Sequence, residues 1–277
     1  APAAEPARAR RPADNRGAGN NRGAVMKLAF SLDKGSGARA RFGLIVLQAD
    51  ETIEPEFARM LGAPGVALHH TRIRMTPNIT TESLITMQAE IPLAAAMLPA
   101  TRFDAVGYAC TSGATVIGPE NVETAVKAGC DCAHVSDPLS ASIAALHHIG
   151  ARKIAYISPY VETVTALMRA RLSAAGLEVA TFASFEESDD RIVSHISQAD
   201  LLQAIVQITA KARVDAVFVS CTNLRVLDIL AEAEALTGKP VVSSNTALAW
   251  HMCRLAGLGA MPIGPGRLLQ RRAKEKG

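Results

Sequence analysis

The sequence is poor in aromatic residues, which make up 4% of its 277 residues, and it has five cysteines. A chain of this length with so few cysteines is not a disulfide-stapled secreted scaffold, and reduced thiols fit it better. No apolar run approaches the roughly 20 residues of a membrane span, and the N-terminal stretch lacks the apolar core of a secretory signal. We therefore expect a cytoplasmic protein with no membrane partner.

Motifs for metals and nucleotides are also missing. The sequence has no H-x-x-x-H pair, no P-loop and no G-x-G-x-x-G stretch. Cys130 and Cys132 form a C-x-C pair, but no second ligand pair follows at a spacing typical of zinc sites. We expect no metal site.

The positive net charge of +3 is concentrated at the two ends. Residues 1–41 carry a net charge of +6 and residues 267–277 carry +4, so the 225 residues between them have a net charge of −7. Binding to nucleic acid requires a basic face on the folded part of a protein. The acidic central region therefore argues against a nucleic-acid partner.

One phrase occurs twice in the chain. Asp104-Ala-Val-Gly-Tyr-Ala-Cys110-Thr returns 111 residues later as Asp215-Ala-Val-Phe-Val-Ser-Cys221-Thr. Each copy is typical of a buried strand that ends at a cysteine, and such a repeat indicates two similar halves. Ligands of open α/β sheets bind at the carboxyl ends of the strands. We expect the two thiols to face each other across one substrate.

The periodicity predicts an α/β protein in which strands and helices alternate throughout both halves. The expected strands are residues 42–48, 66–74, 103–109, 132–136, 153–158, 177–182, 214–220 and 240–243. The expected helices are residues 55–61, 80–97 with a kink at Pro92, 119–128, 137–149, 161–175, 198–212, 224–237 and 246–256. Residues 186–195 read as a polar connector. Two sets of four strands predict two parallel-sheet βα domains.

The domain boundaries follow from the same pattern. We expect a disordered leader over residues 1–41, a first α/β domain over 42–150, a second over 151–244 and a basic tail over 267–277. The sequence does not begin with Met, whereas Met26 starts a plausible coding segment. Two interpretations of the leader stay open, an upstream or vector-derived addition and an Arg-rich transit peptide.

Five motifs between residues 41 and 258 point to a known group. They are G-L-I-V-L-Q-A-D-E-T-I-E-P-E at 43–56, Y-A-C-T-S-G at 108–113, S-P-Y at 158–160, S-C-T-N at 220–223 and V-S-S-N-T-A-L-A-W at 242–250. With the paired cysteines, they resemble the aspartate/glutamate racemase superfamily, and within it the maleate cis-trans isomerases and their ectoine-utilisation relatives. The resemblance implies pseudo-symmetric domains with the active site between them, residues 245–266 packing back on the first domain, and no cofactor. We expect a small carboxylic acid as substrate and a homo-oligomer, either a dimer or a tetramer.

The resemblance implies a reaction that uses both thiols. Cys110 would add to one alkene carbon of a cis-enedioate, the succinyl-like adduct would rotate, and elimination would release the trans product. Cys221 would deliver and then remove the proton at the neighbouring carbon. Because the nucleophile is a thiolate, the N–H groups and the hydroxyls of Thr111 and Ser112 would help by lowering the pKa of Cys110 and by holding a substrate carboxylate.

Four further residues are candidates for binding substrate. The resemblance places a tyrosine that bonds the substrate carboxylate or enolate at Tyr160, although a half-buried aromatic with a wet hydroxyl is an alternative. Thr222 and Asn223 follow the second cysteine, and Asn245 follows the last strand. Their polar groups can donate to a carboxylate, although an asparagine at either place also suits a turn or a helix cap.

Asp50 departs from the pattern of maleate isomerases, in which we expect an asparagine that binds a substrate carboxylate. A carboxylate here would repel a dianion at close range. Asp190 resembles a second replacement of a ligand-binding asparagine by aspartate, although the alignment to the family is looser there. Both changes favour a substrate with an amino or amide group, or a protonated Asp50, and the ectoine-utilisation relatives share this aspartate.

Four functions stay open at this point. The first is a cofactor-independent cis-trans isomerase of maleate-like acids. The second is a racemase, an epimerase or an accessory enzyme acting on a nitrogen-bearing intermediate of ectoine breakdown. The third is a decarboxylase of the arylmalonate type. Cys110 argues against it, because those decarboxylases resemble a version of this two-half pattern that has one thiol, located in the second half. The fourth is a non-catalytic small-molecule binder.

Overall fold

The computed structural model describes residues 26–76, 78–259 and 262–270. Residues 34–270 belong to one unit, while residues 26–33, which contain no helix or strand, belong to a separate one. The predicted leader lies outside the described residues over 1–25, and its last two residues begin the first strand. Of the predicted basic tail, residues 271–277 lie outside the described residues, and Arg267–Gln270 forms a short helix, α12.

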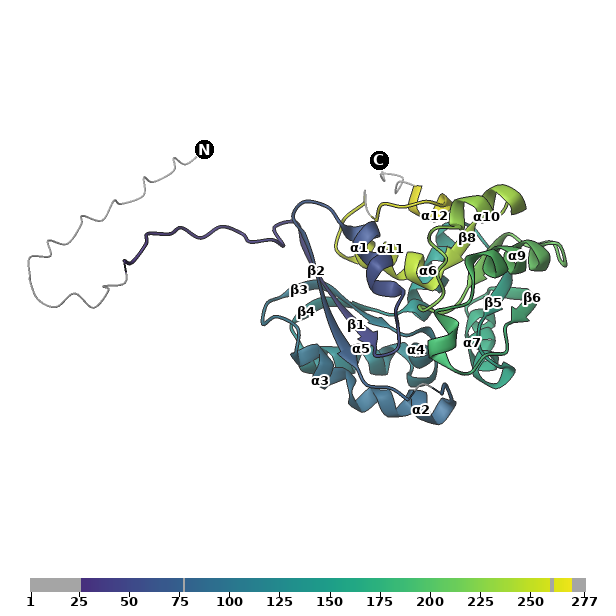
Figure 1. Cartoon of the computed structure of the whole chain (residues 1–277), viewed down its shortest axis with the longest axis horizontal. Helices are drawn as coiled ribbons and strands as arrows, with labels where there is room; N and C mark the ends of the chain where they lie inside the picture. Colours follow the sequence, from purple (N-terminus) through teal and green to yellow (C-terminus); the bar gives the residue numbers. More distant parts are fainter. Residues whose placement is uncertain (1–25, 77, 260–261, 271–277) are drawn as a thin grey trace, which may run out of the picture. The chain divides into compact units, whose positions relative to one another are not determined.

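The described residues form two parallel sheets of four strands each (Figure 1). The first sheet has the order β2-β1-β3-β4 and the second has the order β6-β5-β7-β8, so the two halves repeat one topology. The strands are β1 Ala40–Leu47, β2 Val66–Ile73, β3 Phe103–Ala109, β4 Cys132–Ser136, β5 Lys153–Ser158, β6 Glu178–Ser184, β7 Ala216–Val219 and β8 Val241–Ser243. The predicted α/β fold with two parallel sheets is confirmed.

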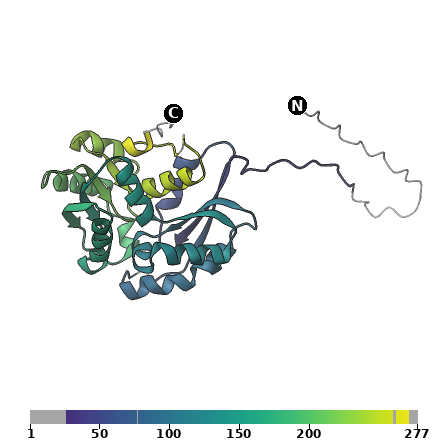
Figure 2. The ribbon, with the colours of Figure 1, turned by 180° about the vertical axis from the view of Figure 1, so that it is seen from behind.

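Helices cover both faces of the sheets. They are α1 Ile53–Leu61, α2 Thr81–Thr86, α3 Ile91–Ala96, α4 Thr111–Ile117, α5 Pro119–Gly129, α6 Pro138–His148, α7 Glu162–Ala174, α8 Asp190–Val193, α9 Gln198–Thr209, α10 Leu230–Thr237 and α11 Ser244–Leu255. Helices α3 and α5 pack on one face of the first sheet, and α1 and α11 pack on the other (Figure 2). Helix α11 follows the last strand of the second sheet but packs against β3, β4 and α6 of the first half.

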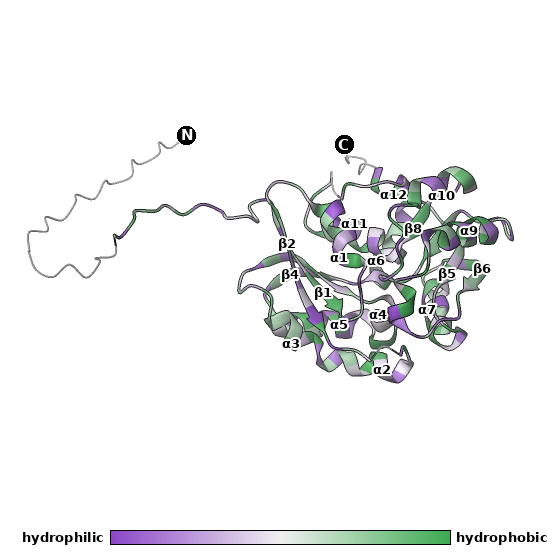
Figure 3. Cartoon of the chain, viewed as in Figure 1, coloured by the Kyte–Doolittle hydropathy of each residue, from purple (hydrophilic) through white to green (hydrophobic). Residues whose placement is uncertain are grey.

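The central strands are buried on both faces, as their continuous apolar sequences predict. Figure 3 shows hydrophobic residues along the strands, whereas the helices carry both hydrophobic and hydrophilic residues. In β3, residues 105–109 are all buried, and all four residues of β7 are buried. The two strands that lead to the cysteines, β3 and β7, are therefore enclosed by packed core residues.

Two predicted helices were wrong in part. The helix expected over 80–97 is divided into α2, a 3₁₀ turn at Met87–Ala89 and α3, because Pro92 occupies the first turn of a new helix rather than a kink within one. The helix expected over 224–237 begins only at Leu230. The N–H of Leu227 donates instead to Glu56 of the first half, so this stretch is bonded across the molecule. The predicted connector over 186–195 contains the one-turn helix α8.

Candidate active site

Cys110 ends β3 and caps the N-terminus of α4. Its backbone is extended, with φ −148° and ψ 112°, and its Sγ accepts a hydrogen bond from the N–H of Gly113 at 3.1 Å. A Cβ on Gly113 would lie 2.5 Å from the Tyr108 hydroxyl and 2.9 Å from the Cys110 Sγ. A glycine is therefore required there, because any side chain would displace the thiol or the tyrosine.

Cys221 follows β7 in the second half and has an unusual backbone, with φ 149°. Few non-glycine residues adopt such angles, and they persist where neighbouring contacts hold them. Here the N–H of Cys221 donates to the Ser244 hydroxyl at 3.1 Å, and the Sγ accepts the N–H of Asn223 at 3.3 Å. This strained turn fixes the direction of the second thiol.

Ser244 joins the two cysteine loops. The Thr111 hydroxyl, next to Cys110, donates to the Ser244 oxygen at 2.8 Å, and the same oxygen accepts the N–H of Cys221. The Thr222 hydroxyl also reaches the carbonyl of Ala109 at 3.4 Å. The two cysteine loops are therefore linked through one serine, while the facing of their thiols across one substrate stays a prediction. Sequence reasoning did not single out Ser244, although it lies within the quoted V-S-S-N motif.

Tyr160 and Asp190 lie beside Cys221. The Tyr160 hydroxyl donates to Asp190 Oδ1 at 2.6 Å and lies 3.3 Å from the Cys221 Sγ. Because the hydroxyl proton is used by the carboxylate, the phenol oxygen can accept the S–H of Cys221. The three groups thus form a chain from thiol to phenol to carboxylate. The contact of Tyr160 with substrate stays a prediction.

Asn223 holds the two halves together at this point. Its Oδ1 accepts the N–H of Glu51 at 2.9 Å, and its Nδ2 donates to the carbonyls of Ala49 at 3.2 Å and Asp190 at 2.9 Å. Its own carbonyl accepts the hydroxyl of Thr52 at 2.9 Å. The side-chain amide is largely occupied by backbone groups, which favours a positioning role over direct contact with substrate.

Asp50 lies at the N-terminus of α1 and is 1% exposed. Its Oδ1 accepts the N–H groups of Thr52 and Ile53, each at 2.8 Å, as expected of a carboxylate at a helix N-terminus. Its Oδ2 has no hydrogen-bond partner among the described residues; the Thr222 hydroxyl is near but donates to a carbonyl. The guanidinium of Arg72 donates to the carbonyl of Asp50 and pairs with Glu54, so it does not neutralise the Asp50 side chain directly.

Glu56, which sequence reasoning missed, is a further buried carboxylate, at 6% exposure. Its Oε1 accepts the N–H of Leu227 at 3.0 Å, and its Oε2 accepts the Nδ2 of Asn245 at 2.8 Å. The same Nδ2 donates to the carbonyl of Thr222 at 2.8 Å, while Oδ1 of Asn245 has no partner among the described residues. Asn245 thus contacts the loop that carries Cys221. Ser112 is half-buried beside Cys110.

Burial dominates the ionisation of the two thiols. It raises the pKa of Cys110 to about 12, with the carboxylates of Asp190 and Asp50 adding to the increase. Burial and the same two carboxylates raise the pKa of Cys221 well above its ordinary value. The Gly113 N–H does favour the Cys110 thiolate, as expected, but burial outweighs it. Both thiols are therefore neutral near pH 7.

The buried carboxyl groups respond in the same direction. Burial raises the pKa of Asp190 to about 6, against the opposing hydrogen bond from Tyr160. Burial raises the pKa of Glu56 to about 7, and it also raises that of Asp50. Asp190 and Glu56, with pKa values of about 6 and about 7, can therefore exchange protons near neutral pH.

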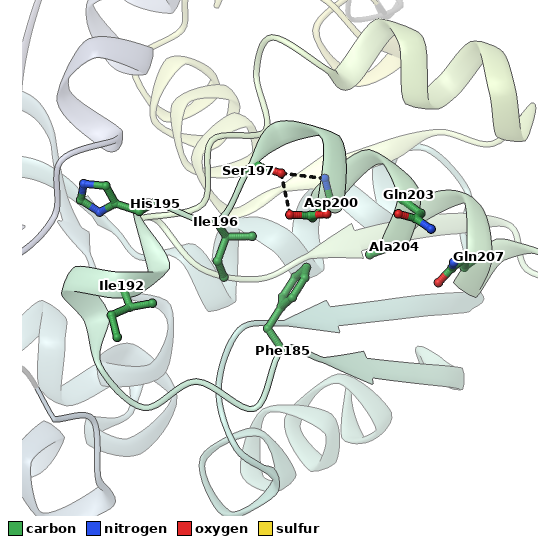
Figure 4. A pocket seen from close by; sticks show the side chains of 9 residues that line it. All are labelled: Phe185, Ile192, His195, Ile196, Ser197, Asp200, Gln203, Ala204 and Gln207. Atoms are coloured by element: carbon green, nitrogen blue, oxygen red, sulfur yellow. Dashed lines mark hydrogen bonds between the residues drawn. The ribbon is translucent and has the colours of Figure 1, made fainter.

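A surface hollow of about 540 Å³ lies elsewhere, beside α8 and along α9 (Figure 4). Its lining includes Phe185, Ile192 and His195, and neither cysteine borders it. Reactive groups define an active site better than volume does. The cluster around the cysteines is therefore the candidate active site, and both of its thiols are at most 5% exposed.

Two other features are absent from the described ranges. Over residues 26–76, 78–259 and 262–270, no three His, Cys, Asp or Glu side chains are grouped so as to hold a metal ion. None of the helices in those ranges has the length and apolar character needed to cross a membrane.

Comparison with known proteins gives a consistent family. The family model described as arylmalonate decarboxylase matches residues 42–269. A maleate isomerase from Pseudomonas putida is 29% identical over 243 residues, covering 83% of this chain and 96% of the relative.

Two solved structures are similar in fold and topology. A Nocardia farcinica maleate cis-trans isomerase mutant, solved with a covalently bound succinylcysteine intermediate, is 26% identical with a TM-score of 0.75 over 83% of this chain and 98% of its own. A maleate isomerase mutant from Pseudomonas putida S16, solved with maleate, is 26% identical with a TM-score of 0.73 over 83% and 97%.

Proposed function

We propose a function from the premise that the chain belongs to the arylmalonate decarboxylase family, the group of the Asp/Glu racemase-like superfamily that also holds the maleate isomerases. The protein is a cofactor-independent isomerase of small carboxylic acids, and its preferred reaction is a cis-trans isomerisation of a maleate-like alkene. The observation that carries the proposal is the pairing of two cysteine loops through Ser244, with Cys221 connected to Tyr160 and Asp190.

In this proposal Cys110 forms the covalent bond. Its S–H proton leaves to a carboxylate as its sulfur adds to one alkene carbon, the π bond breaks, and the proton of Cys221 goes to the neighbouring carbon. The adduct then rotates about what has become a single bond. Elimination restores the double bond, returns the proton to Cys221 and frees Cys110. The similar Nocardia farcinica structure contains a succinylcysteine intermediate, which supports a covalent thioether on this scaffold.

Deprotonation of a thiol with a raised pKa needs a base nearby. Asp190 is well suited, because its pKa of about 6 keeps it mostly ionised at pH 7 and its charge acts on both thiols. The proton that Asp190 takes up from Cys110 can then pass to Cys221 through the Tyr160 hydroxyl, which contacts both Asp190 and the Cys221 sulfur, and it replaces the proton that Cys221 gave to the substrate. Neutral thiols at rest and a shared base are compatible with a site that ionises only when substrate is bound.

A second function is favoured by the carboxylates themselves. Asp50 and Asp190 are each 1% exposed, and neither side chain has a Lys or Arg ion-pair partner among the described residues. A dianionic substrate would meet them unfavourably unless they were protonated. An ammonium or amide group would be attracted. The second candidate is therefore a racemase or epimerase of a nitrogen-bearing acid, such as an intermediate of ectoine breakdown, with the thiols as opposed bases.

The test is proton NMR of the protein with maleate in deuterated buffer. We expect fumarate to appear with the wild type and with Cys253→Ser, a control that removes a buried free thiol of α11 outside the cysteine loops. Cys110→Ser should be folded and inactive. Near-normal turnover by Cys110→Ser would refute its role as nucleophile. If maleate stays intact with the wild type, nitrogen-bearing acids replace it in the same assay, and exchange at Cα identifies the second candidate.

A further inference from the structure

Glu56 is a buried carboxylate that the proposed reaction does not use. It comes from α1 in the first half, yet both of its oxygens accept hydrogen bonds from residues more than 170 positions away, the Leu227 N–H and the Asn245 amide. Asn245 in turn donates to the carbonyl of Thr222, directly after Cys221. A charge on Glu56 can therefore influence the site through one amide group.

The orientation of the Asn245 amide follows from these partners. A carboxylate and a carbonyl oxygen both accept hydrogen bonds, so the group that faces them must be the NH₂ end. The carbonyl end, Oδ1, is then directed away from both and has no partner among the described residues. With Glu56 ionised, Asn245 has an acceptor left for a ligand and no free donor.

Protonation of Glu56 makes the opposite orientation of the amide accessible. The new O–H needs an acceptor, and the Leu227 N–H cannot supply one because it is a donor. Asn245 can supply one by rotating its amide so that Oδ1 accepts from Glu56. The rotation gives up the bond to the Thr222 carbonyl, so it is favoured when a ligand carboxylate accepts from the freed NH₂ end. The NH₂ end then takes the unpartnered position, and a donor becomes available there.

We propose that Glu56 is a positioning residue that sets whether Asn245 presents an acceptor or a donor to the ligand, and that it thereby controls the site's preference between N–H-bearing and carboxylate-bearing substrates. The inference depends on the proposed function only in taking Asn245 as part of the substrate site. With Glu56 ionised the site prefers an ammonium or amide group. With Glu56 protonated it prefers a carboxylate.

The electrostatic surroundings make both forms accessible near neutral pH. Burial raises the pKa of Glu56 to about 7, and the negative charges of Asp50 and Asp228 add to the increase. Asp228 is itself paired with Arg59 at the surface, 2.6 Å away, which weakens its effect. The hydrogen bonds from Asn245 and Leu227 act in the opposite direction.

The substitution Glu56→Gln reproduces the protonated form permanently. Its carbonyl oxygen can still accept the Leu227 N–H, and its NH₂ group must donate to Asn245 Oδ1. Glu234→Gln is a matched control, because Glu234 is also 6% exposed and also accepts backbone N–H groups, from Val241 and Arg267, but has no contact with the cysteine loops. Thermal unfolding of both variants establishes that they are folded.

The first experiment observes the Asn245 side-chain amide by ¹⁵N–¹H NMR between pH 5 and 8.5, with the resonance assigned from its loss in Asn245→Asp. We expect it to titrate with a midpoint near pH 7 in the wild type and in Glu234→Gln, and to stay constant in Glu56→Gln. A constant wild-type resonance, or a titration that persists in Glu56→Gln, would overturn the proposal. This measurement does not depend on turnover, so it is informative even if maleate is not a substrate.

The second experiment measures the affinity for succinate, a saturated dicarboxylate that cannot form the adduct, by calorimetry at pH 6 and pH 8. One hydrogen bond to a charged group corresponds to about tenfold in affinity. We therefore expect the ratio of the wild-type Kd to the Glu56→Gln Kd to rise about tenfold from pH 6 to pH 8. A ratio that does not change with pH would contradict the proposed control of specificity.

Discussion

Replacing Asp190 by asparagine tests the path of proton transfer from Asp190 through Tyr160 to Cys221. The variant keeps the volume of the side chain and an oxygen that can accept a hydrogen bond from Tyr160. In the wild type the Tyr160 hydroxyl donates to the Asp190 carboxylate at 2.6 Å. It removes the carboxylate that takes the proton of Cys110 and passes a proton on to Cys221. Positioned acid–base groups contribute about 10²–10⁴-fold to rates, so we expect kcat to fall by about that factor with a much smaller change in KM.

The pH dependence gives a second and sharper result. Because the pKa of Asp190 is about 6, the wild-type rate should fall as the pH drops through 6, where the carboxyl becomes protonated and cannot accept a proton. Asp190→Asn should lose this acid limb. Asp189→Asn is the control, because Asp189 is adjacent to Asp190 in the chain but pairs with Arg191 at the surface and lies outside the chain of contacts to the thiol.

Stability supplies an independent measure of the same group. A carboxyl whose pKa is raised from 3.8 to about 6 in the folded state stabilises the fold below pH 3.8 and loses that contribution as the pH rises through 6. Two pKa units correspond to about 3 kcal/mol. Relative to Asp190→Asn, the wild type should lose about this much unfolding free energy between pH 3.8 and pH 7 in urea titrations. A variant with an unchanged rate and an unchanged pH profile would refute the proposed role of Asp190.

Three other substitutions have defined outcomes. Gly113→Ala should lower stability by about 1–3 kcal/mol and strongly reduce turnover, because the added Cβ overlaps Tyr108 and Cys110; differential scanning calorimetry and rates check this, and normal values would contradict it. Because the pKa of Glu56 is raised from 4.5 to about 7, the unfolding free energy of the wild type should fall relative to that of Glu56→Gln by about 3 kcal/mol between pH 4.5 and pH 8. A difference between the two proteins that stays constant with pH in urea titrations would be inconsistent with that pKa. Asp50→Asn should raise activity on maleate by removing a buried negative charge, and maleate that stays inert in the NMR assay would exclude Asp50 as the determinant of specificity.

The strands and the cysteine loops could be predicted from local sequence. The buried strands read as continuous apolar runs, and the repeated D-A-V phrase located both thiols at strand ends without knowledge of the third dimension. These features depend on residues close together in the chain. The same reasoning extended the helix before Thr237 too far, because the N–H of Leu227 finds its acceptor on Glu56, 171 residues away.

The connecting residues could not be predicted in the same way. Ser244 bridges partners 133 and 23 positions away, and Glu56 reaches Asn245 across 189 positions. No local pattern distinguishes such a serine or glutamate from one in a helix cap or on a helix surface. The thiol pKa values also depend on complete burial, so the expected lowering at Cys110 was reversed by a property of the assembled halves.

The deep burial of Cys110 and Cys221 determines which thiols of the protein react first with oxidants. Peroxides and disulfides react with exposed thiolates, whereas Cys110 and Cys221 are at most 5% exposed and their raised pKa values keep them as thiols. Half-buried Cys130 and Cys132 are more accessible, and the hydrogen bond between them lowers the pKa of Cys132. Oxidants should therefore modify this peripheral pair first and the two central sulfurs later.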